Sequence, residues 1–152
     1  MIIEANNQRY ALHFYHEPQP SPKAVQRLRD ARLQYMAVYR LATKDVRREM
    51  QSVLRSQYIL RRTTATLHVG APCPSKTRPC TEPVIATGVA KCSVLDVFNP
   101  KIGREISLGK ALKQLKLSRE MTRALFRNYR TRIEQIATRH RQLQSINYKP
   151  RL

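Results

Sequence analysis

Acidic residues are scarce in this sequence, and the sites that they usually build are missing as well. Asp and Glu together number 10 among 152 residues, and they are scattered singly along the chain without paired carboxylates. The 4 glycines form no loop that could cradle a phosphate, and no His-x-Glu arrangement occurs. These absences argue against hydrolytic and group-transfer chemistry, so we expect a protein that is not an enzyme and that needs no cofactor.

Long apolar runs are missing too. No stretch is apolar over the roughly 20 residues that a membrane-spanning helix needs, and residues 1–15 have neither the basic start nor the apolar centre of a secretion signal. The chain holds only 3 cysteines, an odd number that argues against the disulfide framework of a secreted protein. We therefore expect a cytoplasmic protein with reduced thiols and no membrane partner.

Positive charge is abundant where negative charge is scarce. Lys and Arg number 29, which gives a formal net charge of +19, and a compact fold tolerates such self-repulsion best beside a polyanion. Most of these residues are arginines, whose planar guanidinium pairs with phosphate oxygens in a bidentate way and stacks on bases. The composition therefore favours nucleic acid over lipid as the partner.

The sequence patterns predict one α+β domain over residues 1–152, since the 41% of hydrophobic residues can form a core. Short β-prone runs in residues 1–16 surround Asn6-Asn7 and predict two strands. Ser21 and Pro22 are the cap and first residue of a helix predicted over 22–62, either continuous or as two helices joined near Thr43.

The second half of the chain also contains predicted strands followed by predicted helices. Alternating β-branched residues predict an antiparallel hairpin over 63–95 around a proline-rich loop. Helical spacing then predicts C-terminal helices over 106–146, the last of them capped by Ser118. The expected architecture is a small antiparallel sheet flanked by two long basic amphipathic helices.

Arginine-rich faces on these helices are the strongest functional signal. Each phosphate that a cation neutralises releases counterions, which favours binding, and acidic residues are too few to balance the cations as on an ordinary solvated surface. The candidate nucleic-acid-binding residues are Arg40, Lys44, Arg47, Arg48, Arg55, Arg119, Arg123, Arg127 and Arg130. Arg123, Arg127 and Arg130 share one helix face by their spacing.

A helix-turn-helix is a second interpretation of the C-terminal region. Residues 106–115 would be its first helix, Lys116-Leu117-Ser118 its turn, and the helix from Arg119 its recognition helix. The turn lacks the usual glycine, and any helical pair with a capping serine looks similar.

Aromatic side chains offer a further candidate contact, because they can stack on bases. Most of them fit the apolar stripes of the helices, which favours core packing instead. The residues concerned are Tyr35, Tyr39, Tyr58, Phe126, Tyr129 and Tyr148.

A zinc site is conceivable from residue types alone. His68, Cys73, Cys80 and Cys92 supply one imidazole and three thiols, which are the ligands of structural zinc. Their spacing contains no Cys-x-x-Cys pair, and free cysteines are commonly buried as small apolar residues. We therefore expect no bound metal.

The segment from Gly88 to Leu112, GVAKCSVLDVFNPKIGREISLGKAL, resembles a segment of small basic proteins from bacteriophages and mobile elements. The resemblance covers about a sixth of the chain and brings no assigned activity. It implies a phage or mobile-element origin, and hence the host cytoplasm as location. From the residues themselves, we expect Gly103 to adopt a positive φ in a tight turn, and Gly109 to let the following helix approach the sheet.

Two functions remain open on this basis. The first is non-enzymatic binding of DNA or RNA through arginine-rich helix faces. The second is an inhibitor or adaptor that docks on a host nucleoprotein complex, for example an anti-defence protein such as an anti-CRISPR, or a transcription regulator.

Overall fold

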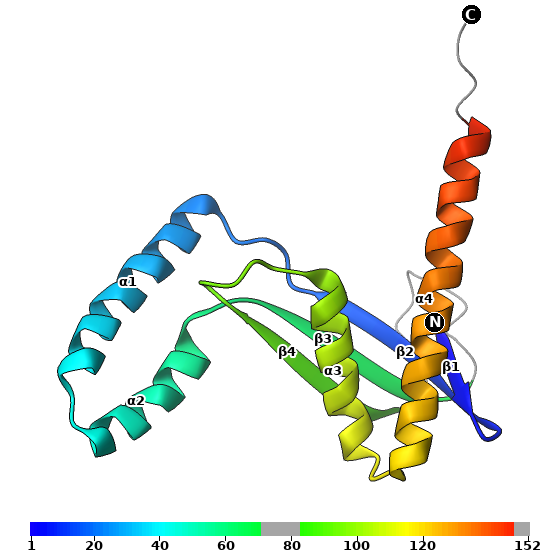
Figure 1. Ribbon diagram of the computed structural model, residues 1–152, viewed down its shortest axis with the longest axis horizontal. Coiled ribbons are helices and arrows are strands. Elements are labelled where there is room, and N and C mark those ends of the chain that lie inside the picture. Colours follow the sequence, from blue (N-terminus) through cyan, green and yellow to red (C-terminus); the bar gives the residue numbers. More distant parts are fainter. Residues whose placement is uncertain (71–82, 148–152) are drawn as a thin grey trace, which may run out of the picture.

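The computed structural model describes residues 1–70 and 83–147, and for residues 143–147 it describes the backbone alone. This part of the chain forms a four-stranded antiparallel sheet and four helices, which confirms the α+β class (Figure 1). Most of the proline-rich loop predicted over residues 70–83, namely residues 71–82, and the basic tail 148–152 lie outside the described residues.

The sheet consists of two hairpins in the order β1-β2-β3-β4. Strands β1 (Ile2–Ala5) and β2 (Gln8–His16) meet at Asn6 and Asn7, whose φ angles of 48° and 62° are both positive. Two positive φ angles in a two-residue loop match the twist of a hairpin, and asparagine tolerates them well. Strands β3 (Ile59–Val69) and β4 (Val84–Ser93) form the second predicted hairpin.

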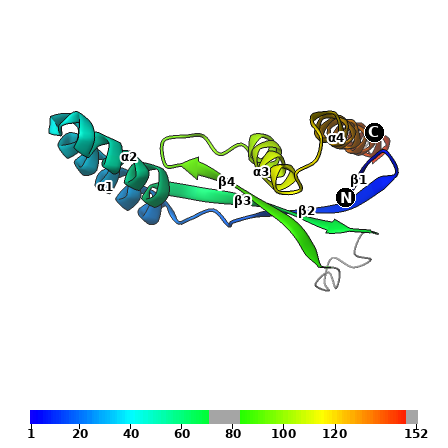
Figure 2. The same ribbon diagram turned by 90° about the horizontal axis from the view of Figure 1, so that it is seen from below.

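Helices α3 (Pro100–Gln114) and α4 (Arg119–Asn147) cover one face of this sheet and run in opposite directions (Figures 1 and 2). Between the helices and the sheet lies the hydrophobic core. Its buried residues are Ile3, Tyr10, Leu12, Ala65, Leu67, Ala86, Leu108, Ala111, Leu112, Met121, Leu125 and Tyr129. The N-terminal half of α4 is therefore fixed to the sheet, whereas its residues from Glu134 to Gln142 are exposed.

Helix α3 lies close to the sheet because two glycines leave room for it. A Cβ atom on Gly88 in β4 would stand 1.9 Å from the backbone oxygen of Ser107 and 2.5 Å from the nitrogen of Ala111. Within α3, a Cβ on Gly103 would stand 2.6 Å from Oγ1 of buried Thr63. The expectation that Gly109 provides this approach is wrong, since its nearest neighbour is the ring of Phe126.

The predicted start of α3 at residue 106 is wrong by six positions. Asn99 accepts hydrogen bonds from the amides of Lys101 and Ile102, and Pro100 occupies the first helical turn. An asparagine cap followed by proline is a favourable helix start. Gly103 is therefore helical. The expectation that its φ is positive is wrong.

The region predicted as a helix to residue 62 forms two helices and the beginning of a strand. Helix α1 (Pro22–Leu41) ends before Ala42 and Thr43, both of which are extended, and α2 covers Lys44–Gln57. Residues 59–62 belong to β3, where they pair with β4. The junction near Thr43 is confirmed, and the helix end at 62 is wrong because strand pairing outweighs the local helical pattern.

Helices α1 and α2 project beyond the end of the sheet where β2 ends and β3 begins (Figure 1). Neither helix contains a buried residue. We call this pair the helical arm, residues 22–57. It does not flank the sheet as expected, and the helices on the sheet are α3 and α4.

Tyrosines in α1, together with Tyr58 directly after α2, hold the arm together. Tyr35 donates a hydrogen bond to the carbonyl of Met50 (3.2 Å) and lies 5.7 Å from the ring of Tyr58, and Gln51 donates to the hydroxyl of Tyr39 (3.2 Å). These tyrosines are half-buried between the two helices. They serve the packing of the arm, as the pattern favoured.

None of the helices in residues 1–70 and 83–147 combines the length and the apolar character needed to cross a bilayer.

Candidate nucleic-acid interface

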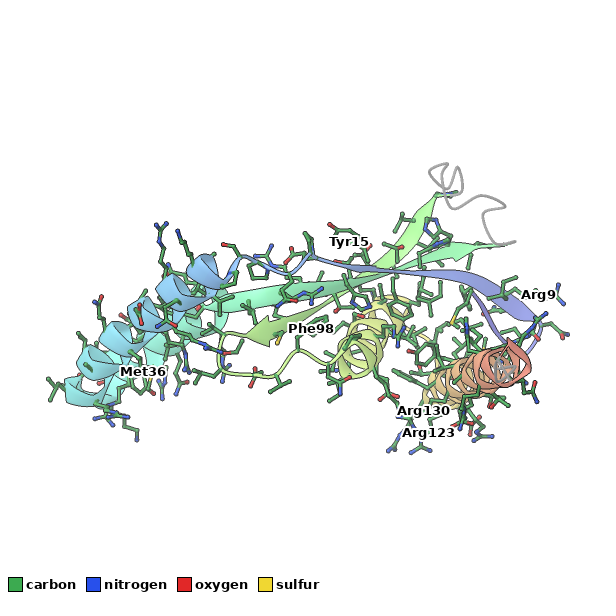
Figure 3. All side chains as sticks on the ribbon, turned by 90° about the horizontal axis from the view of Figure 1, so that it is seen from above. Arg9, Tyr15, Met36, Phe98, Arg123 and Arg130 are labelled. Atoms are coloured by element: carbon green, nitrogen blue, oxygen red, sulfur yellow. The ribbon has the colours of Figure 1, made fainter. Side chains whose placement is uncertain are left out.

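The outer face of α4 carries a row of arginines that no carboxylate neutralises. Arg119, Arg123 and Arg127 are exposed and follow one another at intervals of four residues. Within the described part of the chain none of them forms an ion pair. Arg123 points away from the sheet, on the side opposite Tyr15 (Figure 3). This row, defined by these three residues, is called the α4 arginine row.

The row begins at a well-formed helix start. Ser118 accepts a hydrogen bond from the amide of Met121 (3.1 Å), which confirms the predicted cap. Lys116, two residues before Ser118 in the turn, has a φ of 50° and is exposed, so it adds a cation beside the row. Met121, Leu125 and Tyr129 on the inner side of the helix are buried. Packing of that inner side directs the arginines outward.

Arg130 shares this side of the helix but is engaged with an acid. Its Nε lies 3.3 Å from Oε1 of Glu105 in α3. Arg130 is therefore already paired with a carboxylate, whereas its spacing alone placed it with the unpaired arginines.

A groove of about 520 Å³ runs along this part of α4. The groove is lined by Thr122, Arg123, Phe126, Arg127, Arg130, Thr131 and Glu134. Phe126 is the aromatic residue among them. Phe126 is half-buried and packs at the margin of the core. Phe126 was among the aromatic residues predicted from the sequence as candidates for base stacking, with core packing favoured for most of them, and the two threonines were not predicted. In the sequence, Thr122 and Thr131 stand three or four residues from arginines of α4, and this spacing could have indicated that they lie on the same helix face.

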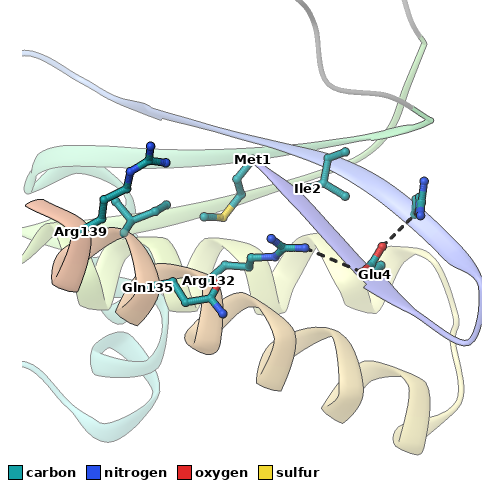
Figure 4. A pocket seen from close by; sticks show the side chains of 8 residues that line it. Met1, Ile2, Glu4, Arg132, Gln135 and Arg139 are labelled. Atoms are coloured by element: carbon teal, nitrogen blue, oxygen red, sulfur yellow. Dashed lines mark hydrogen bonds and ion pairs between the residues drawn. The ribbon is translucent and has the colours of Figure 1, made fainter.

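A second groove, of about 570 Å³, lies between β1 and the exposed half of α4 (Figure 4). Here Glu4 forms ion pairs with both Arg9 (3.2 Å) and Arg132 (3.8 Å). One carboxylate thus partly neutralises two of the three arginines that line this groove.

The candidates on the arm lie far from α4, at the other end of the molecule (Figure 1). Arg40, Lys44, Arg48 and Arg55 are exposed there. Arg47 is committed to the junction, since it donates hydrogen bonds to the carbonyls of Ala42 (2.9 Å) and Arg40 (2.8 Å) at the end of α1. The structure therefore divides the nine predicted residues between two separate surfaces.

The helix-turn-helix interpretation does not fit the arrangement of α3 and α4. The two helices of that motif cross at roughly 90–120°, whereas α3 and α4 run side by side in opposite directions on one sheet face (Figures 1 and 2). Core packing also holds α4 along its inner side. They form a helical hairpin on the sheet.

The four candidate zinc ligands cannot surround one ion. Cys92 pairs with Arg61, which is seven positions along β3 from His68, and seven residues of strand span roughly 23 Å at about 3.3 Å each. Cys73 and Cys80 lie outside the described residues. In the remainder of the chain no group of three His, Cys, Asp or Glu residues could hold a metal. Burial, with Asp96 adding to it, raises the pKa of the Cys92 thiol.

Two histidines of β2, His13 and His16, have lowered pKa values in the folded protein. Burial lowers the pKa of His16, and the guanidinium groups of Arg104 and Arg61 lower it further. Burial likewise lowers the pKa of His13, with smaller contributions from the amino terminus and His68. In the unfolded chain these imidazoles regain an ordinary pKa near 6.5. The unfolded state then binds protons more readily than the folded state.

We therefore expect the free energy of unfolding to be highest above about pH 6.5 and to fall as the pH drops through the lowered pKa values of the folded state. Thermal unfolding measured between pH 7.5 and 5 checks this. A His13→Gln/His16→Gln variant should show a flatter dependence over the same range. An equally steep loss in the variant would show that other groups cause it.

No protein-family model, no curated protein and no solved structure matches this chain.

Proposed function

We propose that this chain is a non-enzymatic nucleic-acid-binding protein that contacts the phosphate backbone through the α4 arginine row. The observation that carries the proposal is that Arg119, Arg123 and Arg127 are exposed on successive turns of a helix fixed to the sheet, without ion pairs among the described residues. Cations one helical turn apart, about 5.4 Å, can follow neighbouring phosphates of a strand.

The rest of the molecule supports the same assignment. A net charge of +19 attracts a polyanion from a distance and speeds association. The arginines pay no cost for breaking existing ion pairs when they bind phosphate, unlike Arg9, Arg130 and Arg132. The hydrophobic contacts on the inner side of α4 hold the row in place, so little order has to be created on binding.

The proposal is tested by measuring the affinity of the purified protein for oligonucleotides of unrelated sequences over a range of salt concentrations. We expect binding of single or double strands with log K falling linearly against log salt concentration, because phosphate contacts release counterions. Sequence should matter little, since phosphate contacts carry no base information. Failure to bind any DNA or RNA at low salt would refute the proposal.

The helical arm favours a second candidate function, an adaptor or inhibitor that docks on a nucleoprotein complex. Leu33 (66% exposed), Val38 (61%) and Leu41 (90%) leave apolar surface on the arm uncovered. Apolar surface of this kind is typical of contacts between proteins. A pull-down with nuclease treatment distinguishes the two: a partner that stays bound without nucleic acid, and is lost in a Leu33→Lys/Val38→Lys variant, supports the adaptor.

A further inference from the structure

The groove beside the α4 arginine row contains an aromatic side chain, that of Phe126. A surface that bound only the phosphate backbone of nucleic acid would need cations but no aromatic ring. We propose that Phe126 is a stacking platform for an unpaired base, and that the protein therefore prefers single-stranded nucleic acid. This inference rests on the proposed function and adds the class of its ligand.

Phe126 lies between α3 and the groove that Arg123 and Arg127 also line. A Cβ atom built on Gly109 would stand 3.4 Å from Cζ and 3.8 Å from Cε2 of Phe126, so the edge of the ring lies against α3. The side chain is nevertheless only half-buried and lines the groove together with Arg123 and Arg127. A supported ring with remaining exposure can hold a flat apolar ligand without rearranging.

The chemistry around the ring is that of a nucleotide site. Arginines on the same side of the helix can pair with the phosphates that flank a stacked base. The hydroxyl of Thr131 offers a hydrogen-bond partner at the groove wall, whereas the hydroxyl of Thr122 already donates to the carbonyl of Ser118 (3.0 Å). Glu134 at the C-terminal end repels phosphate, which directs the strand toward the arginine row at the N-terminal end.

Base stacking on an aromatic ring beside a basic groove distinguishes single strands from duplexes. In a duplex each base is already stacked on its neighbours and paired, so its face is not available to the protein. In a single strand the face is free, and any base can use it, which gives binding with little sequence preference. A groove that only followed phosphates would show no such discrimination.

The absence of tryptophan from the chain provides a direct probe. A Phe126→Trp variant carries one tryptophan in the groove, and stacking of a base should quench its fluorescence when single-stranded oligo(dT) is added. A Tyr15→Trp variant is the matched control, because Tyr15 is 61% exposed on the opposite side of the sheet (Figure 3). Its fluorescence should stay unchanged at the same degree of binding.

A Phe126→Leu variant supplies the second measurement. Leucine keeps the apolar packing and removes the ring, so affinity for oligo(dT) should fall about tenfold, within the range expected for one stacked base. The slope of log K against log salt concentration should not change, since no charge is removed. Affinity for a duplex of the same length should stay the same.

The outcomes separate the inference from the proposed function. Absence of any binding by the wild-type protein would overturn both. Binding of duplex and single strand with equal affinity, or no quenching of the tryptophan at position 126 in the oligo(dT) complex, would overturn the stacking platform and leave the phosphate contacts standing. Quenching in the groove with a preserved salt slope in the leucine variant is the result that supports it.

Discussion

A Gly88→Ala substitution should destabilise the fold by about 3 kcal/mol, the upper end of what overpacking usually costs. The added methyl group would stand 1.9 Å from the backbone oxygen of Ser107 and 2.5 Å from the nitrogen of Ala111. Both atoms belong to the backbone of α3, so no side-chain rotation can relieve the clash. Helix α3 would have to move away from β4 and open the core around Leu108 and Leu112.

Urea denaturation followed by circular dichroism measures this effect, and Gly109→Ala is its matched control. A Cβ on Gly109 would meet only the ring of Phe126 at 3.4 Å, an ordinary contact. Alanine is a better helix former than glycine by up to about 1 kcal/mol, so the control should be as stable as the wild type or slightly more so. Similar stability of both variants would contradict the close contact between α3 and β4.

This pair of glycines shows where the sequence analysis was accurate and where it was not. It expected a glycine to admit the helix to the sheet but chose Gly109, which lies in α3 and faces α4. An isolated glycine inside an alternating strand, as Gly88 is in β4, indicates a close backbone approach. The signal was therefore present, but the neighbour that approaches Gly88 is a helix about twenty residues further along the chain.

Features governed by neighbouring residues were predicted well. The turn at Asn6 and Asn7, the pairing of β3 with β4 and the cap at Ser118 all follow from local chemistry. The start of α3 was missed although it is local too, because Gly103 was interpreted as a turn residue. Asn99 before Pro100 was the better guide.

Features governed by distant residues could not be obtained from patterns of spacing. Periodicity places Arg123, Arg127 and Arg130 on one face, but it does not reveal that Glu105 lies opposite Arg130 alone. Likewise, the basic pattern of α1 and α2 does not show that these helices project from the sheet, nor that Arg47 is used at their junction. The candidate interface is therefore smaller than the nine residues predicted from the sequence, and it lies near the start of α4.

Replacing Arg119, Arg123 and Arg127 together by alanine should weaken binding to single-stranded nucleic acid and flatten its dependence on salt. Each phosphate contact on a single strand contributes about 0.7 to the slope of log K against log salt concentration. Three lost contacts should thus reduce the slope by about two units. The melting temperature should change by a few degrees at most, because all three side chains are exposed and alanine favours helix formation.

The helical arm provides a control of equal charge. Arg40, Arg48 and Arg55 are also exposed arginines, so an Arg40→Ala/Arg48→Ala/Arg55→Ala variant loses the same three charges at the other end of the molecule. Long-range attraction depends on net charge and should weaken similarly in both variants, whereas the slope reports direct contacts. A larger loss of slope in the arm variant would move the binding surface from α4 to the arm, and equal small losses in both would show that only the overall charge matters.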